Sequence, residues 1–179
     1  GLPVLIHVAD PVAFFDPIDE TNERWEEIGE HPDWAFTSPP FPSFMEIMLG
    51  FFNLVKRHAN TTFIGAHVGC YGENLEWVGN MLDVCPNYSI DISARLGELG
   101  RQPYTARGFF IQYQDRILFG SDMSPDLDAY RLYYRFLETE DEYFNYNTSE
   151  VPGQGRWYVC GLYLPDDVLA KVYYKNAAK

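Results

Sequence analysis

The stretch TFIGAHVG, residues 62–69, is an apolar run of strand length that carries a histidine near its end. The runs VLIHV at residues 4–8 and ILFGSD at residues 117–122 have the same form. Near-continuous apolar runs are typical of parallel strands buried on both faces. In a barrel of parallel strands the carboxyl ends open on one face, where catalytic residues collect. We therefore expect three side chains to be neighbours in space: His7, His67 and Asp122.

The whole chain reads as an alternation of strands and helices. Strands are predicted at residues 4–8, 62–68, 88–93 and 117–121. Helices are predicted from Ser43 onward, over about 74–84, 104–113 and 127–137, and from Pro165 onward. This order predicts an α/β fold with a parallel sheet. A complete barrel of eight such units takes about 250 residues, so four units in one domain of residues 1–179 predict half a barrel.

Two segments interrupt this rhythm. Residues 9–42, rich in Pro, acidic and aromatic residues, form a long insertion after the first strand. Such a loop is either a functional lid or a packed surface excursion. Residues 139–163 are acidic and then punctuated by Gly and Pro, and we expect them to be irregular and to pack outside the barrel.

The composition excludes several classes of protein. A net charge of −13 argues against binding to nucleic acid, whose phosphates require Lys and Arg, and gives no reason to expect binding to anionic membranes. No apolar run approaches the roughly 20 residues that cross a bilayer. The three cysteines are odd in number and widely spaced, so they predict buried, reduced side chains.

Histidine and aspartate at strand ends can bind a divalent metal or carry a proton. A single histidine there is more often structural, but three such residues at the same end of three strands favour a site. Gly65 and Gly69 flank His67 and are expected to allow close backbone approach beside that site.

At this point the sequence resembles the amidohydrolase-related family of the metal-dependent hydrolase superfamily. The resemblance covers essentially the whole chain. It rests on PVLIH at residues 3–7, TFIGAHVG at 62–69, PNYSIDIS at 86–93, RILFGSD at 116–122 and VYYKNA at 172–177.

The resemblance implies a TIM-like barrel of which this chain holds strands five to eight. It implies that His7 is a metal ligand and that His67 binds a second metal or orients the attacking water or the substrate. It also implies that Asp122 binds the metal and acts as general base, with zinc as the expected metal. The family's first strand carries further ligands in a His-x-His or Glu-x-His pair, and nothing in this sequence corresponds to it. The isolated chain is therefore expected to bind metal weakly.

Other polar residues are weaker candidates. Arg95 follows the third strand and is expected to clamp a substrate carboxylate. Tyr71 and Asp10 lie just beyond strand ends and are candidates for the pocket wall. His31 and His58 read as surface or capping residues. Arg101 and Arg107 are expected to make surface ion pairs.

Three functions follow as hypotheses. The first is a metal-dependent hydrolase that cleaves a C–N or C–O bond of a small organic substrate with metal-activated water. The second keeps the metal but performs non-oxidative decarboxylation. The third is a truncated half barrel without activity of its own, which forms a homo-oligomer or pairs with the missing half through its exposed sheet edges.

Overall fold

Four short parallel strands form one sheet in the order β1-β2-β3-β4. The computed structural model describes residues 1–147, 150 and 153–179. The strands are β1 (Val4–Ile6), β2 (Phe63–Gly65), β3 (Tyr88–Asp91) and β4 (Ile117–Leu118). Helices alternate with them, so the predicted parallel α/β organisation is confirmed.

Every strand is shorter than its apolar run. For β2 the reason lies in the backbone, because His67, inside the predicted run, has a φ of 59°. Ala94 and Asp122, beyond the ends of β3 and β4, also have positive φ values of 53° and 58°. A positive φ ends the pleat of a strand and turns the chain sharply. The sites of interest therefore lie on tight turns just beyond the strands.

The helices occupy the predicted stretches and some additional ones. The α-helices are α1 (Trp25–Glu30), α2 (Phe44–Arg57), α3 (Ala66–Gly69), α4 (Leu75–Val84), α5 (Leu96–Gly100), α6 (Pro103–Gln112), α7 (Leu127–Glu138) and α8 (Asp166–Ala170). Short 3-10 turns lie at Val12–Phe14 and Pro32–Trp34, and α8 continues as a π-helix over Lys171–Lys175.

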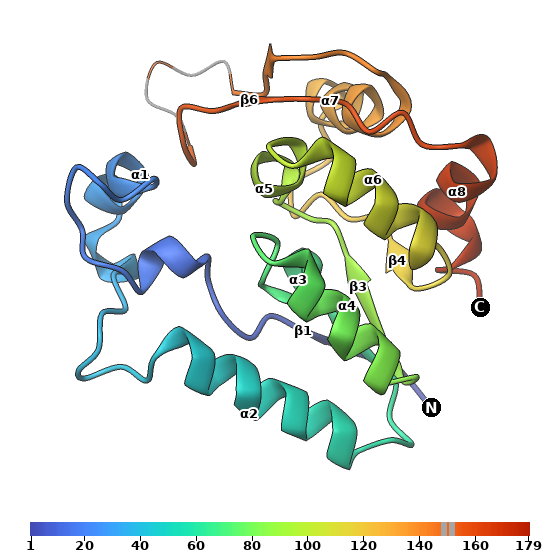
Figure 1. Cartoon of the computed structure of the whole chain (residues 1–179), viewed down its shortest axis with the longest axis horizontal. Coiled ribbons are helices and arrows are strands. Elements are labelled where there is room, and N and C mark those ends of the chain that lie inside the picture. The colour runs from blue at the N-terminus through green and yellow to red at the C-terminus, as the bar shows by residue number, and fades with distance from the viewer. Residues whose placement is uncertain (148–149, 151–152) are drawn as a thin grey trace.

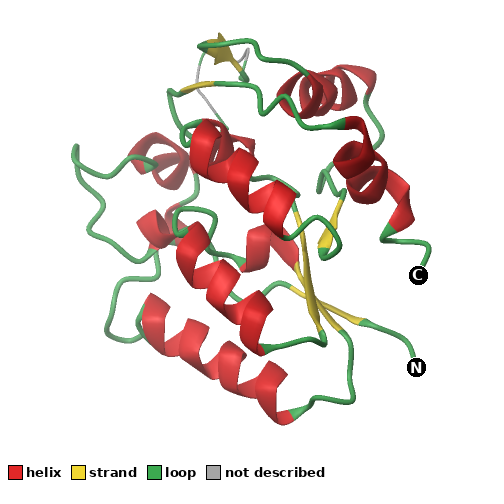
Figure 2. Cartoon of the chain, turned by 45° about the vertical axis from the view of Figure 1, so that its right-hand side comes forward, coloured by secondary structure: helices red, strands yellow, loops and turns green. Residues whose placement is uncertain are grey.

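The first long helix shows why these segments are helical. The Ser43 side chain accepts from the Glu46 N–H, and the Glu46 carboxylate accepts from the Ser43 N–H at 2.8 Å, which completes a capping box. The buried residues of α2 recur at helical spacing: Phe44, Met48, Phe51 and Val55. Figure 2 shows α2, α4 and α6 side by side along one side of the strands, the outer layer expected of a partial barrel.

The segment expected to be irregular contains a two-stranded antiparallel sheet, β5 (Phe144–Asn145) and β6 (Tyr158–Val159). Val159 is fully buried, and a Cβ built on Gly100 of α5 would collide with it. This segment therefore packs on α5, outside the main sheet. Part of it, 148–149 and 151–152, lies outside the described residues.

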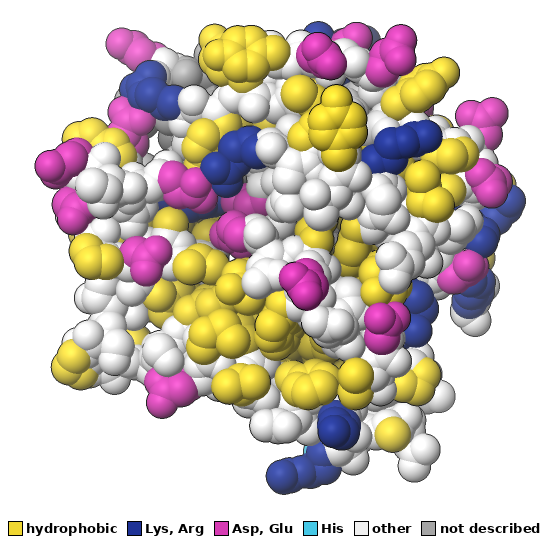
Figure 3. Space-filling view, viewed as in Figure 1, with side chains coloured by type: hydrophobic (Ala, Val, Ile, Leu, Met, Phe, Trp, Pro, Cys, Tyr) yellow, Lys and Arg dark blue, Asp and Glu magenta, His cyan; other side chains and the backbone are white. Residues whose placement is uncertain are grey.

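The insertion after β1 is a packed excursion tied to the rest of the molecule by ion pairs. Arg24 is only 1% exposed and pairs with Glu27 at 2.7 Å and with Glu98 of α5. Glu23 pairs with Arg101 at 2.7 Å. Figure 1 shows α1 and α5 at the carboxyl end of the strands, and Figure 3 shows acidic and basic side chains interspersed over this region.

The sequence led to expectations about the cysteines and about the length of the apolar helices. Cys70 and Cys85 are buried and unpaired, and Cys160 is unpaired and half-buried. In the described ranges, no helix is both long and apolar enough to span a membrane.

Candidate functional site

Two histidines from different strand ends meet at the carboxyl edge of the sheet. His7 follows β1 and His67 follows β2, and Nε2 of His67 lies 3.1 Å from Nδ1 of His7. The rings meet edge to face with centroids 4.8 Å apart. His67 is buried, whereas His7 is exposed. Parallel pairing of β1 with β2 in register places the two residues side by side.

The backbone that carries His67 is left-handed over four consecutive residues. His67, Val68, Gly69 and Cys70 have φ values of 59°, 58°, 64° and 64°. A left-handed conformation costs roughly 1–2 kcal/mol for each residue other than glycine. Such strained segments persist only when their surroundings hold them, and they cluster at functional sites.

Asp91, the last residue of β3, holds this turn. Its Oδ1 accepts from the backbone N–H groups of His67 and Ser93, both at 2.9 Å, and from the Ser93 hydroxyl at 2.6 Å. A carboxylate that accepts several N–H and O–H bonds fixes the groups around it. Asp91 therefore couples the end of β3 to the histidine of β2.

Ser93 determines which ring nitrogen of His67 carries the proton. The Ser93 carbonyl oxygen lies 3.0 Å from His67 Nδ1 and the Ser93 hydroxyl lies 2.9 Å from it. Because the hydroxyl proton is donated to Asp91, both oxygens act as acceptors toward Nδ1. The network thus assigns the proton to Nδ1 and leaves a lone pair on Nε2, which faces His7.

The two histidines differ in their electrostatic environment. Burial, and then the charge of Arg95, lowers the pKa of His67. The interaction with Asp10, whose carboxylate lies 3.6 Å from Nε2, raises the pKa of His7. His7 is accordingly the better proton holder of the two. A proton on its Nδ1 would be shared with Nε2 of His67, and loss of that proton frees both nitrogens for a metal ion or a substrate.

Asp122 lies beyond the end of β4 on the same edge of the sheet. It is exposed, and its charge makes a small contribution to the raised pKa of His7. It lines a cavity of about 560 Å³. The wall of this cavity also includes Ala94, Leu96, Met123, Leu132, Tyr133 and Tyr146.

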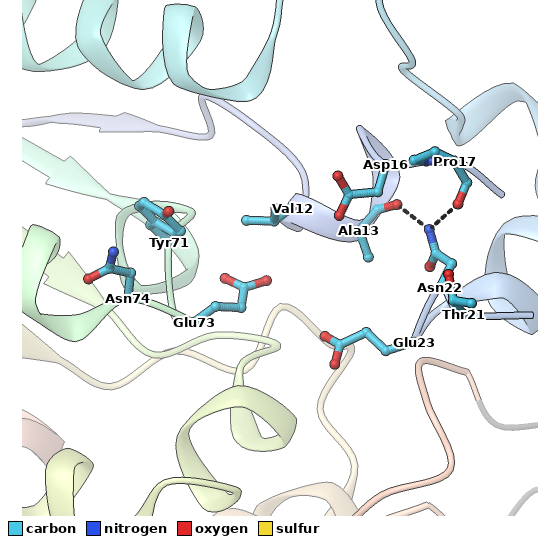
Figure 4. A pocket seen from close by; sticks show the side chains of 10 residues that line it. All are labelled: Val12, Ala13, Asp16, Pro17, Thr21, Asn22, Glu23, Tyr71, Glu73 and Asn74. Carbon is cyan, nitrogen blue, oxygen red and sulfur yellow. Dashed lines mark hydrogen bonds between the residues drawn. The ribbon is translucent and has the colours of Figure 1, made fainter. Parts of the chain in front are cut away.

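Tyr71 lies on a different cavity, also of about 560 Å³, between the insertion and the start of α4. Figure 4 shows the residues that line it, among them Asp16, Glu23 and Glu73. In the described part of the chain, neither carboxylate oxygen of Glu73 has a hydrogen-bond partner. Burial, followed by the charge of Glu98, raises the pKa of Glu73. The structure therefore separates Tyr71 from the cavity that contains Asp122.

The other two histidines, together with Arg101 and Arg107, lie away from the histidine pair. His58 caps the end of α2, and His31 stacks on Trp34 with ring centroids 3.9 Å apart, so both are surface residues as predicted. Arg101 makes its predicted ion pair. The predicted surface ion pair of Arg107 is wrong, because its guanidinium donates to the backbone carbonyl oxygens of Leu162 and Tyr163.

The structure shows which group approaches the backbone at two glycines. Gly65 and Gly69 were expected to allow close backbone approach beside the site. The group that approaches is the hydroxyl of Tyr88, with which a Cβ at either position would collide. Both glycines are needed for packing inside the core, and Gly69 also has a φ of 64°.

Asp91 and Ser93 are the site residues that the sequence did not single out as functional. The signal available was their position, since PNYSIDIS places an acid and a hydroxyl at a strand end. Nothing in the local sequence predicts that both contact His67, because that contact depends on the left-handed turn.

The donor atoms fit part of a metal site. Two nitrogen ligands of a tetrahedral zinc ion lie about 3.3 Å apart, from zinc–nitrogen bonds of about 2.0–2.1 Å. The observed 3.1 Å between Nδ1 of His7 and Nε2 of His67 is close to that edge. However, the described part of the chain contains no group of three or more His, Cys, Asp or Glu side chains placed to bind one ion. The pair is therefore a partial ligand set.

Comparison with known proteins adds one finding. No curated protein and no solved structure matches the chain. The family model described as Amidohydrolase matches residues 1–179, the whole length of the sequence. Together with the parallel sheet and the polar residues at its carboxyl edge, this match places the protein in the amidohydrolase family.

Proposed function

We propose that this chain carries part of the active site of a metal-dependent hydrolase that cleaves a C–N or C–O bond of a small organic substrate. The observation that supports it best is the contact of Nε2 of His67 with Nδ1 of His7 at 3.1 Å. The family membership supports the same class of chemistry.

The proposal gives each residue a role. His7 would donate a nitrogen to a divalent metal, with zinc as the expected ion and Asp122 as a further ligand. Such an ion, when bound, lowers the pKa of water toward neutrality and polarises the bond to be cleaved. His67, with its proton fixed on Nδ1 by Ser93, offers the Nε2 lone pair to a proton of water or substrate. Asp122 faces the cavity and would accept a proton as general base.

The substrate is expected to enter the cavity that Asp122 lines. Its wall combines carboxylate groups with apolar and aromatic side chains, as in pockets for small organic molecules. The volume of about 560 Å³ lies in the range of roughly 300–1,000 Å³ of such pockets.

Product analysis tests this function. The zinc-supplied chain is incubated with a panel of amides, lactones, esters and aromatic acids, beside His67→Ala, Asp122→Asn and the surface control His58→Ala. We expect release of acid or ammonia by the chain and by His58→Ala, and loss of it in the other two variants. Release of carbon dioxide alone would replace hydrolysis by metal-dependent decarboxylation. Equal turnover by all variants would contradict the site.

An exposed sheet edge supports a proposal about partners. Leu5 of β1 is 64% exposed and Val4 is 41% exposed, whereas β4 is covered by Lys171–Lys175. An unpaired apolar edge favours pairing with another strand. We expect the chain to associate through β1 with a second copy or with further barrel strands. Sedimentation of the chain at low and high concentration tests this, and a monomer at both concentrations would contradict self-association.

A further inference from the structure

Arg95 differs from the other buried arginine near the site in what it binds. Both are almost fully buried, with Arg95 4% exposed and Arg24 1% exposed. Arg24 makes hydrogen-bonded ion pairs with Glu27 and Glu98. Arg95 makes no ion pair within the described ranges, and its one hydrogen bond runs from Nη1 to the carbonyl oxygen of Ala94 at 2.8 Å.

The guanidinium of Arg95 therefore has unused donors in a desolvated place. Its Nε has no hydrogen-bond partner among the residues that the structure describes and almost no access to solvent. A buried charged donor without a partner is costly, and such a group in a native structure calls for an explanation. A ligand that offers acceptor oxygens would supply one.

The location of Arg95 ties it to the candidate site. Its neighbours in sequence, Ala94 and Leu96, line the cavity that contains Asp122. Its positive charge acts on both histidines of the pair, since it adds to the lowering of the pKa of His67 and partly offsets the raising of the pKa of His7. The aliphatic stem is held beside Gly72, where a Cβ would lie 3.6 Å from Arg95 Cδ.

We propose that Arg95 is the receptor for a carboxylate group on the substrate, so that the substrate class is a small carboxylic acid. A guanidinium presents its donors in a planar fork that matches a carboxylate. The charges set a limit as well, because Glu27 and Glu98 already oppose the two buried cations Arg24 and Arg95. The unused donors of Arg95 therefore suit a monovalent anion better than a phosphate. That the bound carboxylic acid is a substrate rests on the proposed function. The binding of a carboxylate to Arg95 does not require turnover.

Direct binding separates the two claims. Benzoate is titrated into the chain, with benzyl alcohol and inorganic phosphate as comparison probes, and the Arg95 Nε–H signal is followed by nuclear magnetic resonance. We expect saturable benzoate binding, a shift of that signal, and roughly tenfold or greater loss of affinity in Arg95→Gln. Arg95→Lys should retain part of the affinity, and the exposed-residue control Arg57→Gln should retain all of it.

The opposite results are equally clear. If Arg95 only balances the charge of the glutamates around Arg24, then Arg95→Gln lowers stability and leaves benzoate affinity unchanged, which overturns the inference. Should Arg95→Gln fail to fold, the Nε–H signal of the unmodified chain and the affinity of Arg95→Lys decide. An unmoved signal at saturating benzoate, or binding of benzyl alcohol as tight as benzoate, also overturns it. Benzoate binding without any hydrolysis would leave this inference standing and refute the proposed function.

Discussion

The backbone N–H of His67 donates to Oδ1 of Asp91 at 2.9 Å, across two neighbouring strand ends. The same oxygen accepts two bonds from Ser93, which in turn fixes the proton of the His67 ring. A single carboxylate oxygen thus joins the strained turn after β2 to the end of β3. The orientation of His67 depends on this link.

Removal of that link should weaken the fold more than removal of the hydroxyl alone. Asp91→Ala leaves three donors without an acceptor, and Ser93→Ala removes one of them. Since a hydrogen bond to a charged group contributes about 1.5–3 kcal/mol, we expect Asp91→Ala to lower the free energy of unfolding by more than about 2 kcal/mol and Ser93→Ala by less. Urea unfolding measures both, with exposed Asp83→Ala as control. Equal stability of Asp91→Ala and the control would contradict the role of Asp91.

The two buried tyrosines should respond in opposite ways to loss of their hydroxyl. Tyr88 is 1% exposed and its hydroxyl has no hydrogen-bond partner within residues 1–147, 150 and 153–179. The Tyr133 hydroxyl, in contrast, accepts from the Ala94 N–H at 2.9 Å. An unsatisfied buried polar group costs about 1–3 kcal/mol. Tyr88→Phe should therefore raise the free energy of unfolding, and Tyr133→Phe should lower it, in the same urea experiment. A loss of stability in Tyr88→Phe would show that its hydroxyl is satisfied.

The buried Arg24 should matter far more to stability than an exposed arginine in a similar pair. Loss of one partner of a buried ion pair costs about 3–5 kcal/mol, because the other charge stays buried alone. An exposed pair contributes about 0–1 kcal/mol. Arg24→Met should thus destabilise strongly, while Arg131→Met, which breaks the exposed pair with Asp128, should not. Thermal or urea unfolding compares the two variants, and similar losses would mean that Glu98 and Glu27 are not anchored by Arg24.

Glu73 predicts a specific dependence of stability on pH. Its pKa in the folded chain is raised above the ordinary 4.5, so the folded state holds the proton more tightly than the unfolded state. This group therefore favours folding below its ordinary pKa and loses that contribution as pH rises through the folded value. Glu73→Gln should gain stability relative to the unmodified chain as pH rises from about 5 to about 7. The control is Glu76→Gln on the exposed side of α4, and a parallel pH profile for both variants would contradict the burial of Glu73.

The sequence predicted the order of elements well because the signals are local. The capping box at Ser43 and the apolar spacing of α2 act within one helix, and both are found as expected. The expected meeting of His7 and His67 is also found. β1 and β2 pair in parallel, with Ile6 opposite Gly65, so the residues just beyond their carboxyl ends are neighbours.

Other features depend on contacts that no local pattern carries. Val68 is β-branched and disfavours positive φ, yet it lies at 58° because Asp91 holds the turn from another strand. The sequence did not predict the short α5 or the β5–β6 pair for a similar reason. They pack on each other through Gly100 and Val159, which are far apart in the sequence. The cavity that Tyr71 lines lies between the insertion and the start of α4, and the ion pair of Arg24 with Glu98 joins that insertion to α5.

The central claim, that the carboxyl ends of these strands hold a metal site, is tested most directly by zinc content. Dialysed chain is loaded with zinc and analysed for bound metal beside His7→Ala, Asp122→Ala and the surface control His58→Ala. The account predicts bound zinc in the unmodified chain and in His58→Ala, and none in His7→Ala or Asp122→Ala. Unchanged zinc in both of the latter variants would contradict it.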